Sequence, residues 1–201
     1  MMAPGARLRL DRVACLRGTR LLFEDLSFAL GPGEAALVTG PNGIGKSSLL
    51  RIAAGLLDPA AGQVDRTGRI ALVNEAAALD PQQTLAAALR FWAAIDGRTA
   101  ADVAAALAAM DIGALAEVPV RMLSTGQRRR AAIARLIASG AEIWLLDEPG
   151  NGLDAASLDA LAAAMAAHRA RGGIVLAASH QPLGLVEPVP IRLAVAAGAA
   201  A

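Results

Sequence analysis

The N-terminal part of the chain alternates apolar and polar residues. Within residues 7–30 the alternating apolar residues are Leu8, Leu10, Val13, Leu26, Phe28 and Leu30. This period of two predicts short antiparallel strands with one buried face. The turn signals Gly18-Thr19 and Gly31-Pro32-Gly33 separate these strands, and residues 62–68, bounded by glycines, predict the edge of a further hairpin.

Four largely apolar runs of strand length follow. They cover residues 34–39, 70–73, 143–146 and 174–178. Runs without alternation are typical of strands that are buried on both faces of a parallel sheet. Helical patterns at 48–54, 128–139 and 155–171 lie between them, so the alternation of strands and helices predicts a parallel sheet with right-handed crossovers.

The apolar period becomes helical between residues 84 and 110. Thr84 can cap one helix and Thr99 a second, with Asp102 in the capping-box position of the second helix. We therefore expect a helical subdomain of about residues 79–135, inserted in a single α/β domain that spans residues 1–201. That domain combines a mostly parallel central sheet with an antiparallel β subdomain.

Composition sets limits on the class of protein. Although 55% of the 201 residues are hydrophobic, no charge-free run of 18 apolar residues predicts a membrane span. The N-terminus carries arginines and lacks the apolar core of a signal peptide. The single cysteine, Cys15, excludes an internal disulfide and is expected to be a small buried side chain.

Charge gives no sign of a nucleic-acid partner, because the formal net charge is only +1. The densest basic cluster consists of Arg128, Arg129, Arg130 and Arg135. We expect this cluster to be the solvated face of a helix.

Residues 40–47 fit the P-loop pattern G-x-x-x-x-G-K-[ST] between a predicted strand and a predicted helix. The residues predicted to hold a nucleotide here are Gly40, Pro41, Asn42, Gly43, Ile44, Gly45, Lys46, Ser47 and Ser48. Glycines let the backbone curl around a polyphosphate, and the following helix adds its N-terminal dipole. Lys46 can reach the β- and γ-phosphates of ATP, and the Ser47 hydroxyl can ligate Mg²⁺.

Two acids follow the apolar run that ends at residue 146. Parallel strands present ligand sites at their carboxyl ends, so Asp147 is predicted to hold Mg²⁺ and Glu148 to polarise the attacking water. An acidic pair that merely caps the next helix is the alternative. The P-loop in the same chain favours the Walker B interpretation.

A third motif is Leu-Ser-Thr-Gly-Gln at residues 123–127. Ser124 and Gln127 fit a capping box for the next helix, and on its own this is the simpler interpretation. Beside the other two motifs, the helix N-terminus with Gly126 becomes a second phosphate-binding face.

The order of these motifs, ending in a lone histidine at position 180, resembles that of the ABC ATPases over nearly the whole chain. The resemblance implies a P-loop ABC-type ATPase domain that closes as a head-to-tail homodimer around two ATP molecules. It implies that Ser124, Gly126 and Gln127 contact the ATP held by the partner copy. It also implies that Asp154 is the acid of a D-loop at residues 151–154.

The same resemblance assigns the catalytic roles to Lys46, Glu148 and His180. A neutral imidazole at His180 can donate to the γ-phosphate or hold the attacking water. His168, in the middle of a predicted helix, is expected to be an ordinary surface residue.

Within that family, residues 42–46, 123–135 and 172–183 are similar to the CcmA subfamily, the ATP-binding subunits of a haem exporter in cytochrome c maturation. This implies a peripheral protein on the cytoplasmic face of the inner membrane. It also implies multi-span partners of the CcmB and CcmC kinds. ATP hydrolysis would then drive haem handling on the far side of the membrane.

The chain departs from the family pattern at two places. A glutamine is expected where Ala76 stands, so Glu75 is a candidate substitute, while Gln82 and Gln83 lie farther along the chain. No aromatic residue lies near Arg17, where an adenine-stacking ring is expected, and the Arg17 guanidinium plane can stack instead.

Three alternatives remain open on the sequence alone. The chain can be the motor of another small exporter, for lipids, peptides or drugs. It can be an ABC ATPase that acts on DNA repair complexes or ribosomes, although it has neither a second cassette nor a coiled-coil insertion. It can also be a nucleotide-binding scaffold that hydrolyses slowly or not at all, because the glutamine is missing.

Overall fold

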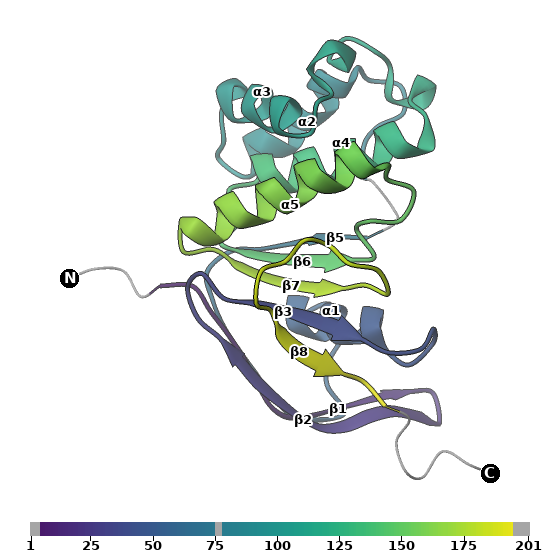
Figure 1. The fold of residues 1–201 in the computed structure, drawn as a ribbon, viewed down its shortest axis with the longest axis vertical. Helices are drawn as coiled ribbons and strands as arrows, with labels where there is room; N and C mark the ends of the chain where they lie inside the picture. Colours follow the sequence, from purple (N-terminus) through teal and green to yellow (C-terminus); the bar gives the residue numbers. More distant parts are fainter. Residues whose placement is uncertain (1–4, 75–77, 195–201) are drawn as a thin grey trace.

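The computed structural model describes residues 5–74 and 78–194, which form two sheets and five α-helices (Figure 1). The elements are β1 (Arg7–Arg17), β2 (Arg20–Leu30), β3 (Ala35–Thr39), α1 (Lys46–Ala54), β4 (Ala61–Thr67), β5 (Ile70–Val73), α2 (Leu85–Ile95), α3 (Ala100–Ala109), the 3₁₀ turns η1 (Gly113–Leu115) and η2 (Val120–Met122), α4 (Thr125–Ala138), β6 (Ile143–Asp147), α5 (Ala155–Ala170), β7 (Ile174–Ala178) and β8 (Val189–Arg192). One sheet is antiparallel in the order β2-β1-β4, and the other is parallel in the order β5-β6-β7-β3-β8. The predicted fold class is confirmed.

The parallel sheet divides the interior into two hydrophobic layers. Helices α2–α5 cover one face, whereas α1 and the antiparallel sheet cover the other (Figure 1). In β6, Trp144 and Leu146 pack on the helical side, while Ile143 and Leu145 pack on the α1 side. Because successive side chains of a strand alternate, a wholly apolar strand serves both layers.

The predicted N-terminal strands form one long hairpin. The antiparallel pairing is confirmed, but β1 and β2 have 11 residues each and are not short. Register shifts such as the one between Leu10 and Val13 bend the pair and let it continue. The edge predicted at residues 62–68 is confirmed, because β4 is an edge strand of this sheet, but the predicted hairpin was wrong, because β4 pairs with β1 and not with a sequence neighbour. Glycine is required at position 62, where β4 lies against β1, since a Cβ atom there would collide with the Arg12 carbonyl.

The two helices predicted after residue 84 are present with their caps. The Thr84 hydroxyl accepts a backbone amide at the start of α2. Thr99 and Asp102 form a complete capping box at the start of α3. These helices pack with α4 in the same hydrophobic cluster, so local capping and the helical period were sufficient to predict them.

The sequence pattern did not reveal the last strand. β8 lies parallel to β3 at the edge of the sheet, and Pro190 interrupts its apolar pattern. The Leu193 amide donates to the Thr39 carbonyl over 2.9 Å. Because alternate residues of a strand turn their amides to the same side, the nitrogen of Pro190 faces away from β3. Proline is tolerated here because its missing donor lies on the open edge.

His168 is buried, so its predicted surface position was wrong. It is 5% exposed, and its ring stacks on Trp144 with centroids 3.9 Å apart and planes 9° apart. Its Nε2 atom lies 3.3 Å from the Ile174 carbonyl oxygen. Burial lowers the pKa of His168 from 6.5 to about 4, because the charged ring would lose its hydration. Gly173 makes room for the ring, since a Cβ atom there would collide with the imidazole.

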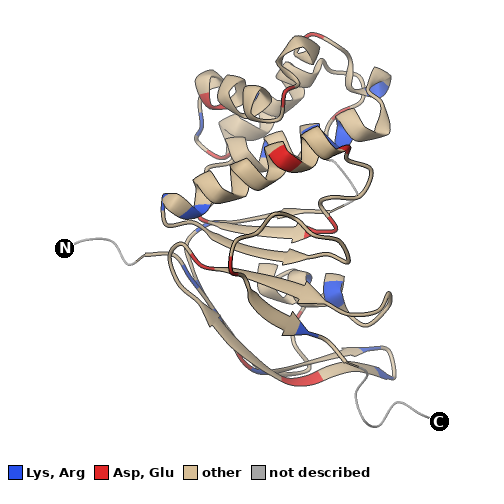
Figure 2. Ribbon diagram, viewed as in Figure 1, with Lys and Arg blue, Asp and Glu red and all other residues tan. Residues whose placement is uncertain are grey.

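Charged residues of both signs are interspersed along the helices and the antiparallel sheet (Figure 2). The strands of the parallel sheet are uncharged except at the carboxyl ends of β6 and β8. Within residues 5–74 and 78–194, no helix has the length and hydropathy needed to cross a bilayer. Charge in the sheet therefore gathers at its carboxyl edge, next to the P-loop.

Candidate active site

The P-loop runs from the end of β3 to the start of α1. Gly40 has a φ of 147°, and a Cβ atom there would lie 2.7 Å from the Leu193 carbonyl oxygen. Gly45 has a φ of 115°, and a Cβ atom there would lie 3.1 Å from the Phe23 ring. Both positions therefore require glycine for backbone conformation and for space. Gly45 is also the N-cap of α1 and makes no side-chain cap, so the first amides of the helix remain available to an anion.

Lys46 is buried at the first turn of α1, with 7% exposure. Its Nζ atom donates to the carbonyl oxygens of Gly40 at 2.9 Å and Pro41 at 3.4 Å. The same atom lies 3.6 Å from Oε1 of Glu148. The loop carbonyls and the acid together compensate a charge that would otherwise be costly to bury.

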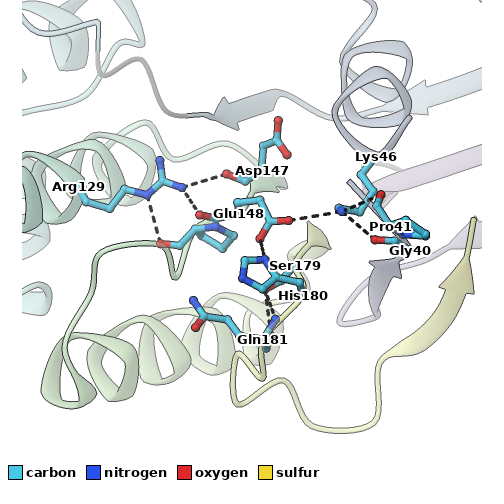
Figure 3. A network of polar contacts seen from close by, with 10 residues as sticks. Gly40, Pro41, Lys46, Arg129, Asp147, Glu148, Ser179, His180 and Gln181 are labelled. Carbon is cyan, nitrogen blue, oxygen red and sulfur yellow. Dashed lines mark hydrogen bonds and ion pairs between the residues drawn. The ribbon is translucent and has the colours of Figure 1, made fainter. Parts of the chain in front are cut away.

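The two acids at the carboxyl end of β6, Asp147 and Glu148, have different surroundings. Oδ1 of Asp147 is buried and has no hydrogen-bond partner. Glu148 has a φ of 47°, which is unusual for a residue with a side chain. Its carboxylate lies between Lys46 and His180, with Oε2 2.9 Å from Nδ1 of His180 (Figure 3). Three residues that are far apart in the sequence therefore meet at one carboxylate.

These groups share a cavity of about 570 Å³ at the carboxyl edge of the sheet. Its lining includes the predicted residues Asn42, Gly43, Gly45, Lys46, Ser47, Ser48, Asp147, Glu148 and His180. Gly40 and Pro41 contribute the carbonyls that hold Lys46, and Ile44 is buried inside the loop.

Two lining residues, Arg20 and Leu22, were missed by sequence reasoning. Arg17 and Asn151 of the predicted D-loop complete the lining. Arg17 was predicted to stack on the base, but its companion Arg20 was missed. The signal was available, because Gly18-Thr19 is a tight turn and makes Arg17 and Arg20 direct cross-strand neighbours.

The third motif does not reach this cavity within one chain. The Ser124 hydroxyl accepts the Gln127 amide at 3.2 Å, and the Gln127 side chain accepts the Ser124 amide at 2.8 Å. This complete capping box starts α4 at Thr125, three residues before the predicted start. A Cβ atom at Gly126 would lie 3.2 Å from the Gly152 carbonyl, so the start of α4 adjoins residues 151–154.

Asp154 also lies outside the cavity. It caps α5 by accepting the Ser157 amide at 2.8 Å. Its hydrogen bonds with Ser157 lower the pKa of Asp154. Its contact with a nucleotide therefore remains a prediction that concerns a second copy of the chain.

The basic cluster on α4 is not a solvated face, so that prediction was wrong for two of its members. Arg129 is 8% exposed and donates to main-chain carbonyls behind Glu148. Arg135 is half-buried, with its guanidinium 3.8 Å from the Trp92 ring centroid. Burial lowers the pKa of Arg135. Only the helix packing distinguishes these arginines from exposed ones.

We predicted that Ala76 stands where the family has a glutamine and that Glu75 is a candidate substitute, but both residues lie outside those that the structure describes. Gln82 and Gln83, the more distant candidates, do not line the cavity. Gln82 accepts from Arg121, and Gln83 donates to Asp80. Both side chains are therefore engaged elsewhere.

Comparisons with known proteins agree with this geometry. A model of the ABC transporter family matches residues 23–151. The chain is 61% identical over 178 residues to the cytochrome c biogenesis ATP-binding export protein CcmA of Sphingopyxis alaskensis, covering 89% of this chain and 92% of that protein. It is 56% identical to the protein of the same name from Zymomonas mobilis, covering 90% and 82%. A solved ATP-binding subunit of an ABC transporter has the same fold, with a TM-score of 0.78 at 24% identity over 86% of this chain and 79% of that one.

Proposed function

This chain belongs to the ABC transporter family of ATPases, and from that premise we propose that it is the motor subunit of a haem exporter in c-type cytochrome biogenesis. The observation that carries the proposal is the Glu148 carboxylate, held 3.6 Å from Lys46 and 2.9 Å from His180 beside a glycine-lined anion site. The names of the similar proteins, which refer to cytochrome c biogenesis and export, support the biological role.

In the proposed reaction, water adds to the γ-phosphorus of ATP, and the bond to the ADP oxygen breaks. Lys46 neutralises negative charge on the β- and γ-phosphates. Glu148 accepts a hydrogen bond from the attacking water and fixes its direction. His180 lies on the other side of that carboxylate and orients Glu148. When bound nucleotide displaces the contact between His180 and Glu148, the imidazole donates to the γ-phosphate instead.

The site also fits Mg²⁺. Asp147 supplies a buried carboxylate oxygen without a partner, and the Ser47 hydroxyl lines the same cavity. In the part of the chain that the structure describes, no group of three His, Cys, Asp or Glu residues could hold a metal alone. Phosphate oxygens and water would complete the ligand set, as is usual for Mg²⁺. When bound, the ion neutralises charge that develops on the phosphates.

A second copy of the chain completes the site. Ser124, Gly126 and Gln127 lie at the start of α4 and, with Asp154, outside the cavity of their own chain. The Ser124 oxygen accepts the Gln127 amide, which leaves the hydroxyl hydrogen to donate to a phosphate oxygen. In a head-to-tail dimer this helix N-terminus meets the γ-phosphate held by the other copy.

The nucleobase lies against arginine in this proposal. The chain has no tyrosine, and the nearby Phe23 is buried against Gly45. Arg17 and Arg20 are exposed at the mouth of the cavity. A guanidinium plane can stack on a base, but it discriminates little between adenine and guanine.

An ABC transporter ATPase works with membrane subunits and as a dimer. For this chain we take the partners to be multi-span proteins of the CcmB and CcmC kinds, and its place to be the cytoplasmic face of the inner membrane. Phe91 and Ile95 support a docking surface on α2, because they are 56% and 62% exposed one helical turn apart. Residues 1–201 then form one ABC ATPase domain, with residues 79–135 as its helical subdomain.

Replacing Glu148 by glutamine tests the ATPase site. We expect Glu148→Gln to bind Mg-ATP and to form a dimer in size-exclusion chromatography, while phosphate release stops. Glu142→Gln is the matched control, because Glu142 lies at the opposite end of β6 in an exposed contact with Arg69. A Glu148→Gln protein that remains monomeric with Mg-ATP contradicts the shared site.

The transport role needs a cellular test. A bacterium that lacks its own cytochrome c biogenesis export ATPase is supplied with this chain, and covalently bound haem in its c-type cytochromes is stained. We expect the intact chain, but not Lys46→Ala, to restore the stain. Restored ATPase activity without restored cytochromes would instead favour the motor of another small exporter.

A further inference from the structure

Arg129 stands out because it is buried and is not among the residues that line the nucleotide cavity. It lies in the second turn of α4 and is 8% exposed. Among the residues that the structure describes, its guanidinium donates to the main-chain carbonyls of Asn74, Asp147, Glu148 and Pro149. Figure 3 shows it on the far side of the Glu148 backbone from Lys46.

The chemistry of the guanidinium matches these carbonyls. Nη1 donates to Asn74 and Nη2 to Asp147, both over 2.9 Å, while Nε donates to Pro149 over 3.2 Å. Nη2 also donates to the Glu148 carbonyl. A planar fork with five N–H groups can satisfy carbonyls that converge from two segments, whereas an ammonium group cannot do so in one plane.

The backbone at Glu148 needs such support. Its φ of 47° is unfavourable for a residue with a side chain and persists only where the surroundings hold it. The Glu148 amide donates to the Ala178 carbonyl at the end of β7 over 2.9 Å. Arg129 holds the carbonyl of the same residue, so both ends of its peptide backbone are fixed. This conformation directs the carboxylate at Lys46 and His180.

We propose that Arg129 is the positioning residue that fixes the hydrolytic carboxylate and ties it to helix α4. The proposal rests on the function assigned above to Glu148. Helix α4 begins at the Ser124 cap, which is the end that faces the partner copy, and it also carries Arg129, which supports Glu148 of the same chain. When the start of α4 contacts the nucleotide held by the partner copy, α4 and Arg129 thereby transmit this contact to Glu148 of the same chain.

The experiment compares Arg129→Met and Arg129→Lys with the intact chain. ATP hydrolysis gives kcat and KM, and a fluorescent ATP analogue gives the dissociation constant. We expect Arg129→Met to lower kcat at least about tenfold, while KM and the dissociation constant stay within about twofold, because the P-loop is untouched. Arg129→Lys should recover part of kcat, since one ammonium replaces only some of the donated hydrogen bonds.

Arg130→Met is the matched control. Arg130 also donates to main-chain carbonyls, but to those of Met110 and Asp111 at the end of α3. We expect its kcat to stay within about twofold of the intact chain. A merely structural role for Arg129 would lower the melting temperature and weaken nucleotide binding together with kcat.

The outcomes separate this proposal from the proposed function. If the intact chain does not hydrolyse ATP, the proposed function fails first. If it does, an unchanged kcat in Arg129→Met, or a parallel loss of nucleotide binding in both variants, overturns the role of Arg129. Should Arg129→Met fail to fold, Arg129→Lys decides: lower kcat with unchanged ATP affinity supports the proposal, and unchanged kcat refutes it.

Discussion

Protonation of His168 should destabilise the fold in mild acid. Its ring is stacked on Trp144 and buried, so its pKa is about 4 in the folded chain and 6.5 when exposed. A group whose pKa is lowered by folding binds more protons in the unfolded chain between these two values. Stability is therefore fully present above pH 6.5 and is lost as the pH falls toward 4.

The size of the effect follows from the two pKa values of His168. Proton linkage between pH 7.5 and pH 5.0 gives a loss of about 2 kcal/mol in the free energy of unfolding. For a chain of this size that corresponds to a melting temperature about 4–8 °C lower. Asp102 and Asp154 do not disturb this window, because their pKa values are lowered below 3.8 and they stay ionised at pH 5.0.

The assay is thermal unfolding followed by circular dichroism at pH 7.5, 6.5, 5.5 and 5.0. The variant His168→Gln keeps a donor for the Ile174 carbonyl but cannot be protonated, so its melting temperature should be nearly constant over this range. His180→Gln removes the other histidine of the chain and should retain the slope of the intact protein. A melting temperature of the intact chain that changes by less than about 1 °C, or an equal slope in His168→Gln, refutes the reasoning.

Three further predictions concern other parts of the molecule. Arg17→Ala should weaken ATP and GTP binding several-fold in calorimetry but leave tripolyphosphate binding unchanged; equal weakening of all three would place this arginine on the phosphates. Phe91→Asp should abolish co-purification with the membrane subunits without changing the ATPase activity of the isolated chain. Val186 is 67% exposed on another part of the surface, and Val186→Asp should change neither co-purification nor ATPase activity. Gly173→Ala should lower stability by about 2 kcal/mol or more, because its methyl group would collide with His168; a melting temperature equal to that of the intact chain would contradict this packing.

Much of this fold could be predicted because its signals are local. The strand, glycine loop and helix around residues 40–54 follow from apolar runs and a spaced motif. The caps at Thr84, Thr99 and Ser124 follow from side chains that hydrogen-bond within three residues. Family resemblance then brought the motifs together, and the structure places Lys46, Glu148 and His180 in contact.

The features that were missed depend on contacts between distant segments. The burial of His168 depends on Trp144 from β6 and on the space left by Gly173. Arg129 is buried because main-chain carbonyls at the carboxyl ends of β5 and β6 converge on it. A helical pattern cannot distinguish such an arginine from a solvated one, because the signal lies in the partners and not in the helix.

The proline in β8 bears on how copies of this chain can meet. An edge strand normally offers a row of free donors and acceptors on which another molecule can continue the sheet. Pro190 removes a donor from the middle of that row on the side facing away from β3. Strand-by-strand association between copies is thereby discouraged at this margin of the sheet, which lowers the tendency of the protein to aggregate through it.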